Sequence, residues 1–155
     1  MDYKLTRYRG KTVNGEWVYG SLFHGETEEG NEACIIFTNP IITTASDGDN
    51  GKEGIAFDIN ELAVVRANSV GVYIGMTDLY NRPVYVWDIV QEKGGRKYLV
   101  VWDAKRFAFM VVNYDIFKGS KHQKWVGREI ADDDFYYFEV VGNLIDEMDN
   151  EACED

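Results

Sequence analysis

Short runs of β-branched and aromatic residues, most of them closed by a glycine-containing turn, recur along the whole chain, and no long amphipathic helical pattern interrupts them. Aromatic residues make up 14% of the 155 residues, and glycine occurs 15 times against 2 prolines. Rings and branched side chains pack well on a pleated surface, and glycine supplies the backbone conformations of tight turns. The pattern therefore predicts a mainly β protein with little helix.

The first half of the chain has the weaker strand signals. An Asn-Gly pair at residues 14 and 15 predicts a hairpin with a type I′ turn. The polar, glycine-rich residues 39–54 are interpreted as a loop. The expected elements are a hairpin at 12–20 continued by a strand at 19–23, a buried strand at 33–37, and one or two strands at 55–67, with a short helix at 59–66 as the alternative.

The second half predicts about five short strands joined by tight turns, a pattern typical of a small SH3-like barrel over residues 70–145. We therefore expect a single domain at 1–145, with subdomains near 1–68 and 69–145, and an acidic tail at 146–155 that is a frayed helix or disordered. The expected elements are strands at 72–76, 84–90, 98–102, 107–112 and 135–141, turns at 78–83 and 93–96, and a helical turn at 114–119.

Cysteine usage and hydropathy bear on the compartment. The two cysteines, Cys34 and Cys153, do not make a disulfide framework, which fits a reducing cytosol. The first residues lack the apolar core of a signal peptide, and no apolar run approaches the ~20 residues of a membrane span. The sequence predicts a cytoplasmic protein with no membrane contact.

Four segments together form a recognisable set. They are 8–11 (YRGK) with 15–22 (GEWVYGSL), 69–78 (SVGVYIGMTD), 84–90 (VYVWDIV) and 138–145 (FEVVGNLI). The last three resemble the motifs TVGQYTGLxD, IYEGDIV and EVIGNIY of the YopX family of bacteriophage and prophage proteins, and the first resembles that family's opening. Their order and spacing agree with the family over residues 8–145. The resemblance implies a phage or prophage origin, a mainly β fold and action in the bacterial host cytoplasm. It supplies no established activity.

This chain departs from the family pattern at polar positions. Val72 stands for the usual Gln, Ile74 for Thr, and Val86-Trp87 for Glu-Gly, while residues 81–83 (NRP) replace an Asn-Gly turn. Any site that used those polar side chains is absent from this member.

Signals for catalysis, metal ions and cofactors are missing from the sequence. His24 and His122 have no nucleophile beside them in a recognisable motif, and no phosphate loop or dinucleotide fingerprint occurs. Residues 47–58 resemble a calcium loop but have Lys52 and Asp58 where that loop needs Gly and Glu. The histidines and cysteines are not paired at zinc-ligand spacing, and the run of acids at 132–134 is interpreted as solvated. We therefore expect no enzyme activity, no metal and no cofactor.

Charge is distributed unevenly along the chain. The formal net charge is −11, yet residues 93–128 hold nine bases and two acids, a net +7, while residues 143–155 hold six acids and no base. Aromatic residues interleave with those bases, as in proteins that stack single-stranded bases above a positive groove. The residues expected to be exposed and to contact a nucleic acid or a protein partner are Lys118, Lys121, His122, Lys124, Trp125 and Arg128.

Three functions remain open from the sequence. The first is a non-enzymatic accessory protein that acts by protein–protein contact as a homo-oligomer, with the basic segment of one copy pairing with the acidic tail of another. The alternative is a nucleic-acid-binding module that uses residues 93–128. The third is an enzyme whose composite site forms at a subunit interface.

Overall fold

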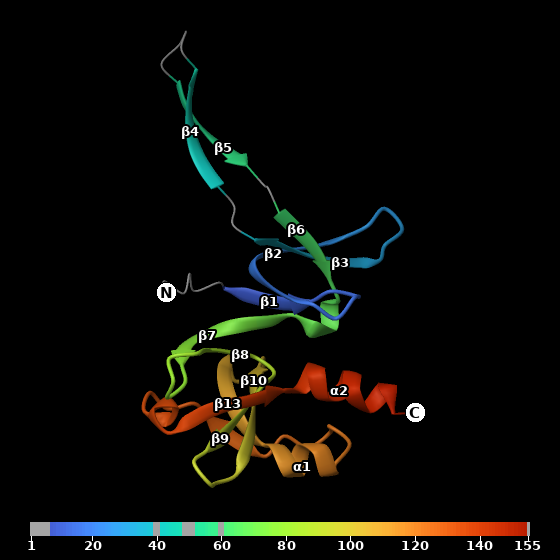
Figure 1. The fold of residues 1–155 in the computed structure, drawn as a ribbon, viewed down its shortest axis with the longest axis vertical. Helices are drawn as coiled ribbons and strands as arrows, with labels where there is room; N and C mark the ends of the chain where they lie inside the picture. Colours follow the sequence, from blue (N-terminus) through green and yellow to red (C-terminus); the bar gives the residue numbers. More distant parts are fainter. Residues whose placement is uncertain (1–6, 39–40, 48–51, 59–60, 155) are drawn as a thin grey trace. The chain divides into compact units, whose positions relative to one another are not determined.

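The computed structural model describes residues 7–38, 41–47, 52–58 and 61–154 (Figure 1). Strands dominate these residues, so the prediction of a mainly β fold with little helix is confirmed. The chain divides into two compact units, Met1–Val70 and Gly71–Asp155. In the described part of the chain, no helix is long and apolar enough to cross a membrane.

The first unit is built from antiparallel strands. Strands β6, β3, β2 and β1 lie next to one another in that order, and β4 pairs with β5 as a separate hairpin. The elements are β1 (Tyr8–Lys11), β2 (Trp17–Glu26), β3 (Glu32–Thr38), β4 (Ile41–Asp47), β5 (Lys52–Asp58), β6 (Glu61–Val65) and the 3-10 turn η1 (Ala67–Ser69).

One face of the β6-β3-β2-β1 sheet holds the core of the first unit. Cys34, Ile36 and Val65 are buried there, and Val18 and Leu22 pack against them partly exposed. A fully buried aliphatic side chain contributes about 1.5–3 kcal/mol. Two such aliphatic residues, Ile36 and Val65, and the small Cys34 side chain make a thin core for the four described strands.

Two expectations for the first unit are wrong. Asn14 does not take the positive φ that a type I′ turn requires; only Gly15 does, at +88°, in a longer turn closed by the Thr12 N–H and the Glu16 carbonyl at 2.9 Å. Most of residues 39–54 form β4 and the start of β5 rather than a loop, because β4 begins with isoleucine and threonine residues, which are enriched in strands. Residues 48–51, within the segment compared with a calcium loop, lie outside the described residues.

The second unit contains a five-stranded antiparallel sheet in the order β12-β11-β10-β9-β13 and a pair formed by β7 and β8. The elements are β7 (Gly71–Thr77), β8 (Pro83–Tyr85), β9 (Asp88–Glu92), β10 (Lys97–Asp103), β11 (Ala108–Asn113), α1 (Tyr114–Gly119), β12 (Gly127–Glu129), the 3-10 turn η2 (Asp134–Tyr136), β13 (Phe138–Asn143) and α2 (Leu144–Cys153).

Both faces of this sheet are covered. On one face, Val100 and Val111 pack with residues of β7, β8 and η2, including Ile74 and Phe135. On the other, Leu99 packs with residues of α1 and α2, among them Phe117 and Leu144. Burial on both faces explains why β10 and β11 are nearly continuous apolar runs rather than alternating ones.

The five-stranded sheet is open among the described residues, because β12 and β13 at its two ends do not pair with each other. The closed barrel that the turn pattern suggests is therefore not found. The predicted helical turn at 114–119 is α1. The acidic tail, expected as a frayed helix or a disordered segment, is helical up to Cys153 as the last part of α2, whose first residues Leu144 and Ile145 are buried.

Candidate functional site

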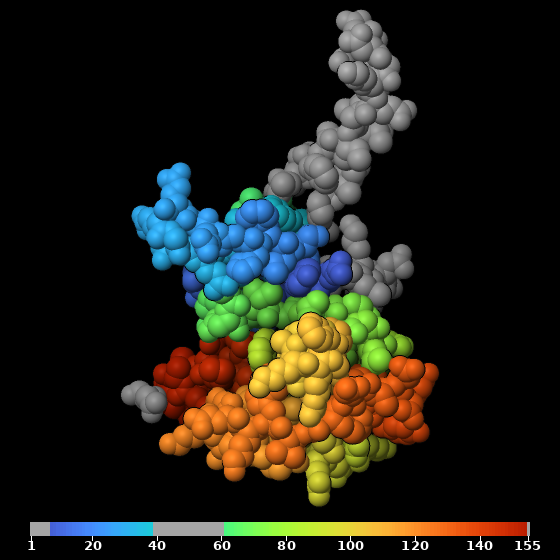
Figure 2. Space-filling view, turned by 180° about the vertical axis from the view of Figure 1, so that it is seen from behind, coloured from blue at the N-terminus to red at the C-terminus, as the bar shows by residue number. Residues whose placement is uncertain are grey.

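The six residues expected to contact a partner follow one another from α1 to β12 in the second unit. Lys118 lies in α1, Lys121 and His122 lie in the turn after it, and Arg128 lies in β12. Figure 2 shows this orange stretch of the chain at the surface of the second unit. A contact residue must lie at the surface. The basic residues differ, however, in whether an acidic side chain of the same chain already pairs with them.

Arg128 is held by an acid of the same unit. Its guanidinium donates two hydrogen bonds to the Asp134 carboxylate, both at 2.6 Å. The bond from Arg128 holds the pKa of Asp134 below its usual range. Asp134 also accepts the Ala131 N–H at 2.7 Å, so the run of acids at 132–134 is not solvated throughout. The pair fixes β12 to η2.

Lys118 faces the acidic helix. Its ammonium lies 2.9 Å from the Glu151 carboxylate and 3.6 Å from that of Glu147, both in α2. The Tyr114 hydroxyl donates a hydrogen bond to Glu147 from the same side of α1. Part of the opposite-charge pairing that the sequence suggested between copies therefore exists within one chain.

Among the other expected contact residues, Trp125 lines an aromatic hollow and His122 packs on a buried ring. The His122 ring stacks on the buried Phe117 ring, with centroids 4.8 Å apart. Trp125 is 44% exposed and Trp102 is 41% exposed, and both line a shallow hollow of about 480 Å³ together with Lys105. Trp102 is therefore partly exposed at the surface, and Lys105, which lines the same hollow, is not among the six residues expected from the sequence.

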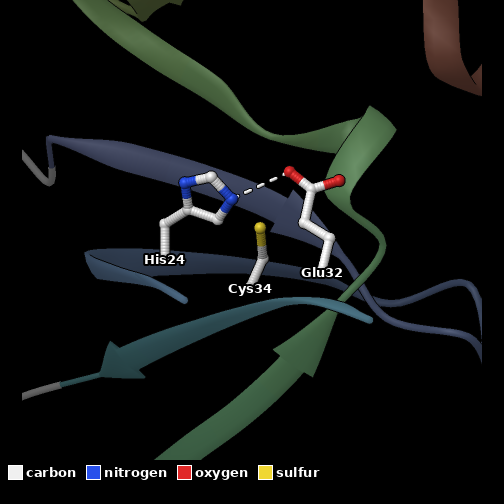
Figure 3. A group of neighbouring side chains, drawn as sticks. All are labelled: His24, Glu32 and Cys34. Atoms are coloured by element: carbon white, nitrogen blue, oxygen red, sulfur yellow. Dashed lines mark hydrogen bonds and ion pairs between the residues drawn. The ribbon is translucent and has the colours of Figure 1, made fainter. Parts of the chain in front are cut away.

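A second group of side chains, in the first unit, was not expected. His24 on β2 stands directly opposite Cys34 on β3, and Glu32 precedes Cys34 by two residues on the same face (Figure 3). The His24 Nε2 and Glu32 Oε1 atoms are 2.8 Å apart, and the Cys34 sulfur lies within 4.8 Å of a ring nitrogen of His24 and of a carboxylate oxygen of Glu32. His24 and Glu32 are exposed, while Cys34 is buried.

Burial, and next the negative charge of Glu32, raise the pKa of the Cys34 thiol. Burial and the carboxylate of Glu32 therefore both favour the neutral thiol of Cys34 over the thiolate. The turn between β2 and β3, light blue in Figure 2, projects from the body of the unit, so solvent reaches this end of the hairpin.

The sequence concealed this group because its spacing matches no metal motif. The group could have been predicted only from the register of the hairpin. The turn at residues 27–31, in which Gly30 has a φ of +78°, sets the register that places residue 24 opposite residue 34. Predicting it required β2 to extend to Glu26, beyond the strand that was expected to end near residue 23.

The face of the first sheet opposite its core is also apolar. Antiparallel pairing aligns Phe23, Ile35 and Val64 in one row, and Phe37 with Leu62 in the next. Phe23, Leu62 and Val64 are 55%, 58% and 60% exposed. We refer to these five residues as the open apolar face. A sheet is stable when its apolar surfaces are packed against another layer, so this face has the character of a contact surface.

Strand β6 stands at the end of the sheet order, and among the described strands it pairs with β3 alone. It carries one charge, Glu61, and no proline. Edge strands that avoid pairing with other chains are usually protected by such residues, and β6 has little of this protection.

No family model matches the chain, and no curated protein matches it.

Proposed function

We propose that this protein acts by protein–protein contact and that its partner is a second copy of the chain, bound through β6 and the open apolar face. The observation that carries the proposal is the exposure of Phe23, Leu62 and Val64 in adjacent rows of one sheet face. Burying such side chains is the main driving force of association, and contiguous exposed apolar surface commonly marks interfaces.

The edge strand favours a second copy over an unrelated partner. Two antiparallel β6 strands related by a twofold axis would continue the sheet, because the same strand then supplies both sides of the pairing. The open apolar faces of the two copies would also become continuous. Backbone hydrogen bonds would specify the alignment, and apolar burial would supply most of the free energy.

Sedimentation velocity over a wide range of protein concentration tests the proposal. The wild-type chain is expected to dimerise, and Val64→Lys is expected to remain monomeric because a lysine on an edge strand opposes pairing. Val13→Lys is the matched control, since Val13 is 81% exposed in the turn after β1. A wild-type chain that stays monomeric, or dimers unaffected by Val64→Lys, would overturn the proposal.

The YopX resemblance is kept as part of this proposal, with its phage or prophage origin and bacterial cytoplasmic location. The family pattern has glycine at positions 75 and 87, and the backbone takes positive φ at both, +87° at Gly75 and +76° at Trp87. A glycine is well suited to such positions. A partly open SH3-like barrel for the second unit also belongs to the proposal, supported by its short antiparallel strands and tight turns.

A second candidate function is nucleic-acid binding, favoured by Trp102 and Trp125 lining one hollow with Lys105. Stacking of a base on an exposed ring contributes about 1–3 kcal/mol and tolerates any sequence. Anisotropy of labelled oligonucleotides should then rise with protein at low salt and fall steeply at physiological salt. Trp125→Ala should abolish the signal, whereas Tyr137→Ala, which truncates another exposed ring, should not. No binding by the wild-type chain at low salt excludes this function.

A further inference from the structure

The hairpin of β2 and β3 presents three different metal-binding side chains at one point. His24 and Cys34 are a cross-strand pair, and Glu32 reaches the same point from one pleat away. The turn that joins the strands is fixed by the Thr27 N–H to the Asn31 carbonyl at 2.9 Å and by the Asn31 N–H to the Thr27 hydroxyl at 3.2 Å. The backbone therefore holds the three side chains together.

Their spacing is close to that of a coordination sphere. The ligand atoms of His24, Glu32 and Cys34 all lie within 4.8 Å of one another. Zinc bonds of about 2.0–2.3 Å place tetrahedral ligand atoms about 3.3–3.8 Å apart. Rotation of the three side chains would bring their ligand atoms to this spacing. In Figure 3 the Cys34 sulfur points toward the gap between the His24 ring and the Glu32 carboxylate.

The ligand types select the class of ion. Calcium and magnesium take oxygen ligands, whereas a thiolate with an imidazole and one carboxylate suits a borderline ion such as Zn²⁺. We propose that His24, Glu32 and Cys34 bind one Zn²⁺ ion, or a transition-metal ion of similar preference, with the fourth position open to solvent beside the exposed His24 and Glu32.

Such an ion would bridge β2 and β3 next to the thin core of the first unit. Cys34 belongs both to that core and to the proposed site, so binding would couple the metal to the packing of Ile36 and Val65. Zinc should therefore raise the thermal unfolding midpoint of the wild-type chain, because a ligand that binds only the folded state stabilises it. This inference is independent of the proposed self-association, which uses the opposite face of the sheet.

Titration of the chelator-treated protein with Co²⁺ tests the site directly. A cobalt ion bound by Cys34 gives a sulfur-to-metal charge-transfer band in the near ultraviolet, and we expect one Co²⁺ per chain, displaced by Zn²⁺. Because outer-shell partners of metal sites are already worth about 10–100-fold in affinity, His24→Gln and Glu32→Gln should each weaken binding by at least that order. Cys34→Ser should remove the band.

The chain offers matched controls. Cys153→Ser and His122→Gln change the second cysteine and the second histidine, which lie in the other unit, and both should leave the band and the affinity unchanged. Because Cys34 is a core residue, the exposed His24 and Glu32 variants keep the test valid if Cys34→Ser fails to fold. No band in the wild-type chain, loss of the band in Cys153→Ser, or unchanged affinity in His24→Gln or Glu32→Gln would overturn the inference.

Discussion

At the residue scale, Asp78 links the turn after β7 to β13. Its buried carboxylate accepts the backbone N–H groups of Tyr80 and Arg82 at 2.9 Å and that of Val140 at 3.0 Å, and the Arg82 side chain lies at 2.8 Å. Burial opposes ionisation, but the hydrogen bonds outweigh it and hold the pKa of Asp78 below its usual range. The ionised carboxylate therefore stabilises the folded second unit.

Asp78→Asn should lower the free energy of unfolding by about 2–3 kcal/mol at neutral pH, because an amide cannot accept all four bonds. An unfolded aspartate titrates near pH ~4. The extra free energy of unfolding of the wild type over Asp78→Asn is therefore fully present above that pH, and it is lost as the pH falls through the lower pKa of Asp78 in the folded state. Urea denaturation at neutral and acidic pH measures both effects. Asp132→Asn, at an exposed aspartate, serves as the control, and an equal loss there would contradict the prediction.

Trp87 combines left-handed backbone with a packed side chain. Its φ is +76°, its N–H donates to the Val100 carbonyl at 2.8 Å, and its indole packs against both apolar clusters of the second unit. A residue with a Cβ loses roughly 1–2 kcal/mol in this conformation, whereas glycine does not. The Trp87 side chain must therefore offset backbone strain through packing.

In a strand, an alanine variant is usually more stable than a glycine variant. At position 87 we expect the opposite order of stability. Trp87→Ala and Trp87→Gly both lose the indole, but we expect the glycine variant to be more stable by about 1 kcal/mol, since only alanine keeps the strain. In the ordinary strand β10, Trp102→Gly should instead be less stable than Trp102→Ala. Chemical denaturation of the four variants measures the difference in stability between alanine and glycine at each position. If alanine were the more stable, or glycine the more stable, at both positions, the argument would be refuted.

At the element scale, α2 depends on its first residues. The Asn143 side chain accepts the Asp146 N–H at 2.8 Å, and Leu144 and Ile145 are the buried residues of the helix. The helix carries four acids and no base, and the two acids in its first turn, Asp146 and Glu147, interact favourably with the helix dipole. The cap and the two apolar residues thus fix where the helix begins and how it attaches to the sheet.

Asn143→Ala should lower the free energy of unfolding by about 1 kcal/mol, whereas Asn143→Ser should stay near the wild type because serine also caps helices. The far-ultraviolet circular dichroism of Asn143→Ala should show less helix. Thermal unfolding of the two variants against the wild type makes the comparison. If Asn143→Ala and Asn143→Ser lost the same free energy of unfolding, the loss would come from another contact of the Asn143 amide and not from helix capping.

The sequence predicted the elements whose pattern is local. Leu99–Val101 and the Gly94-containing turn identify β10 and its connection to β9 without knowledge of any partner strand. The sequence missed β12, whose three exposed residues are a strand only because they pair with β11. It also missed the His24, Glu32 and Cys34 group, because cross-strand proximity depends on register and strand length, which composition does not encode.

At the scale of the whole molecule, part of the charge of the basic segment and of the acidic tail is already paired within one chain. Lys118 is engaged by Glu147 and Glu151, and Arg128 by Asp134, all within the second unit. The net charge of −11 remains, so two copies of the chain repel each other at low ionic strength. The self-association that we propose would therefore rely on a surface that carries little charge, such as the open apolar face.

Added NaCl should therefore strengthen self-association. Salt shortens the screening length to about 8 Å at physiological ionic strength, which weakens repulsion between acidic copies and leaves apolar burial intact. Sedimentation velocity at low, physiological and high NaCl should show a rising dimer fraction in the wild type and none in Val64→Lys. A dimer held by the acidic tail and the basic segment would instead dissociate with salt, and an oligonucleotide complex would do the same. The sign of this one dependence distinguishes an apolar interface from both charge-driven alternatives.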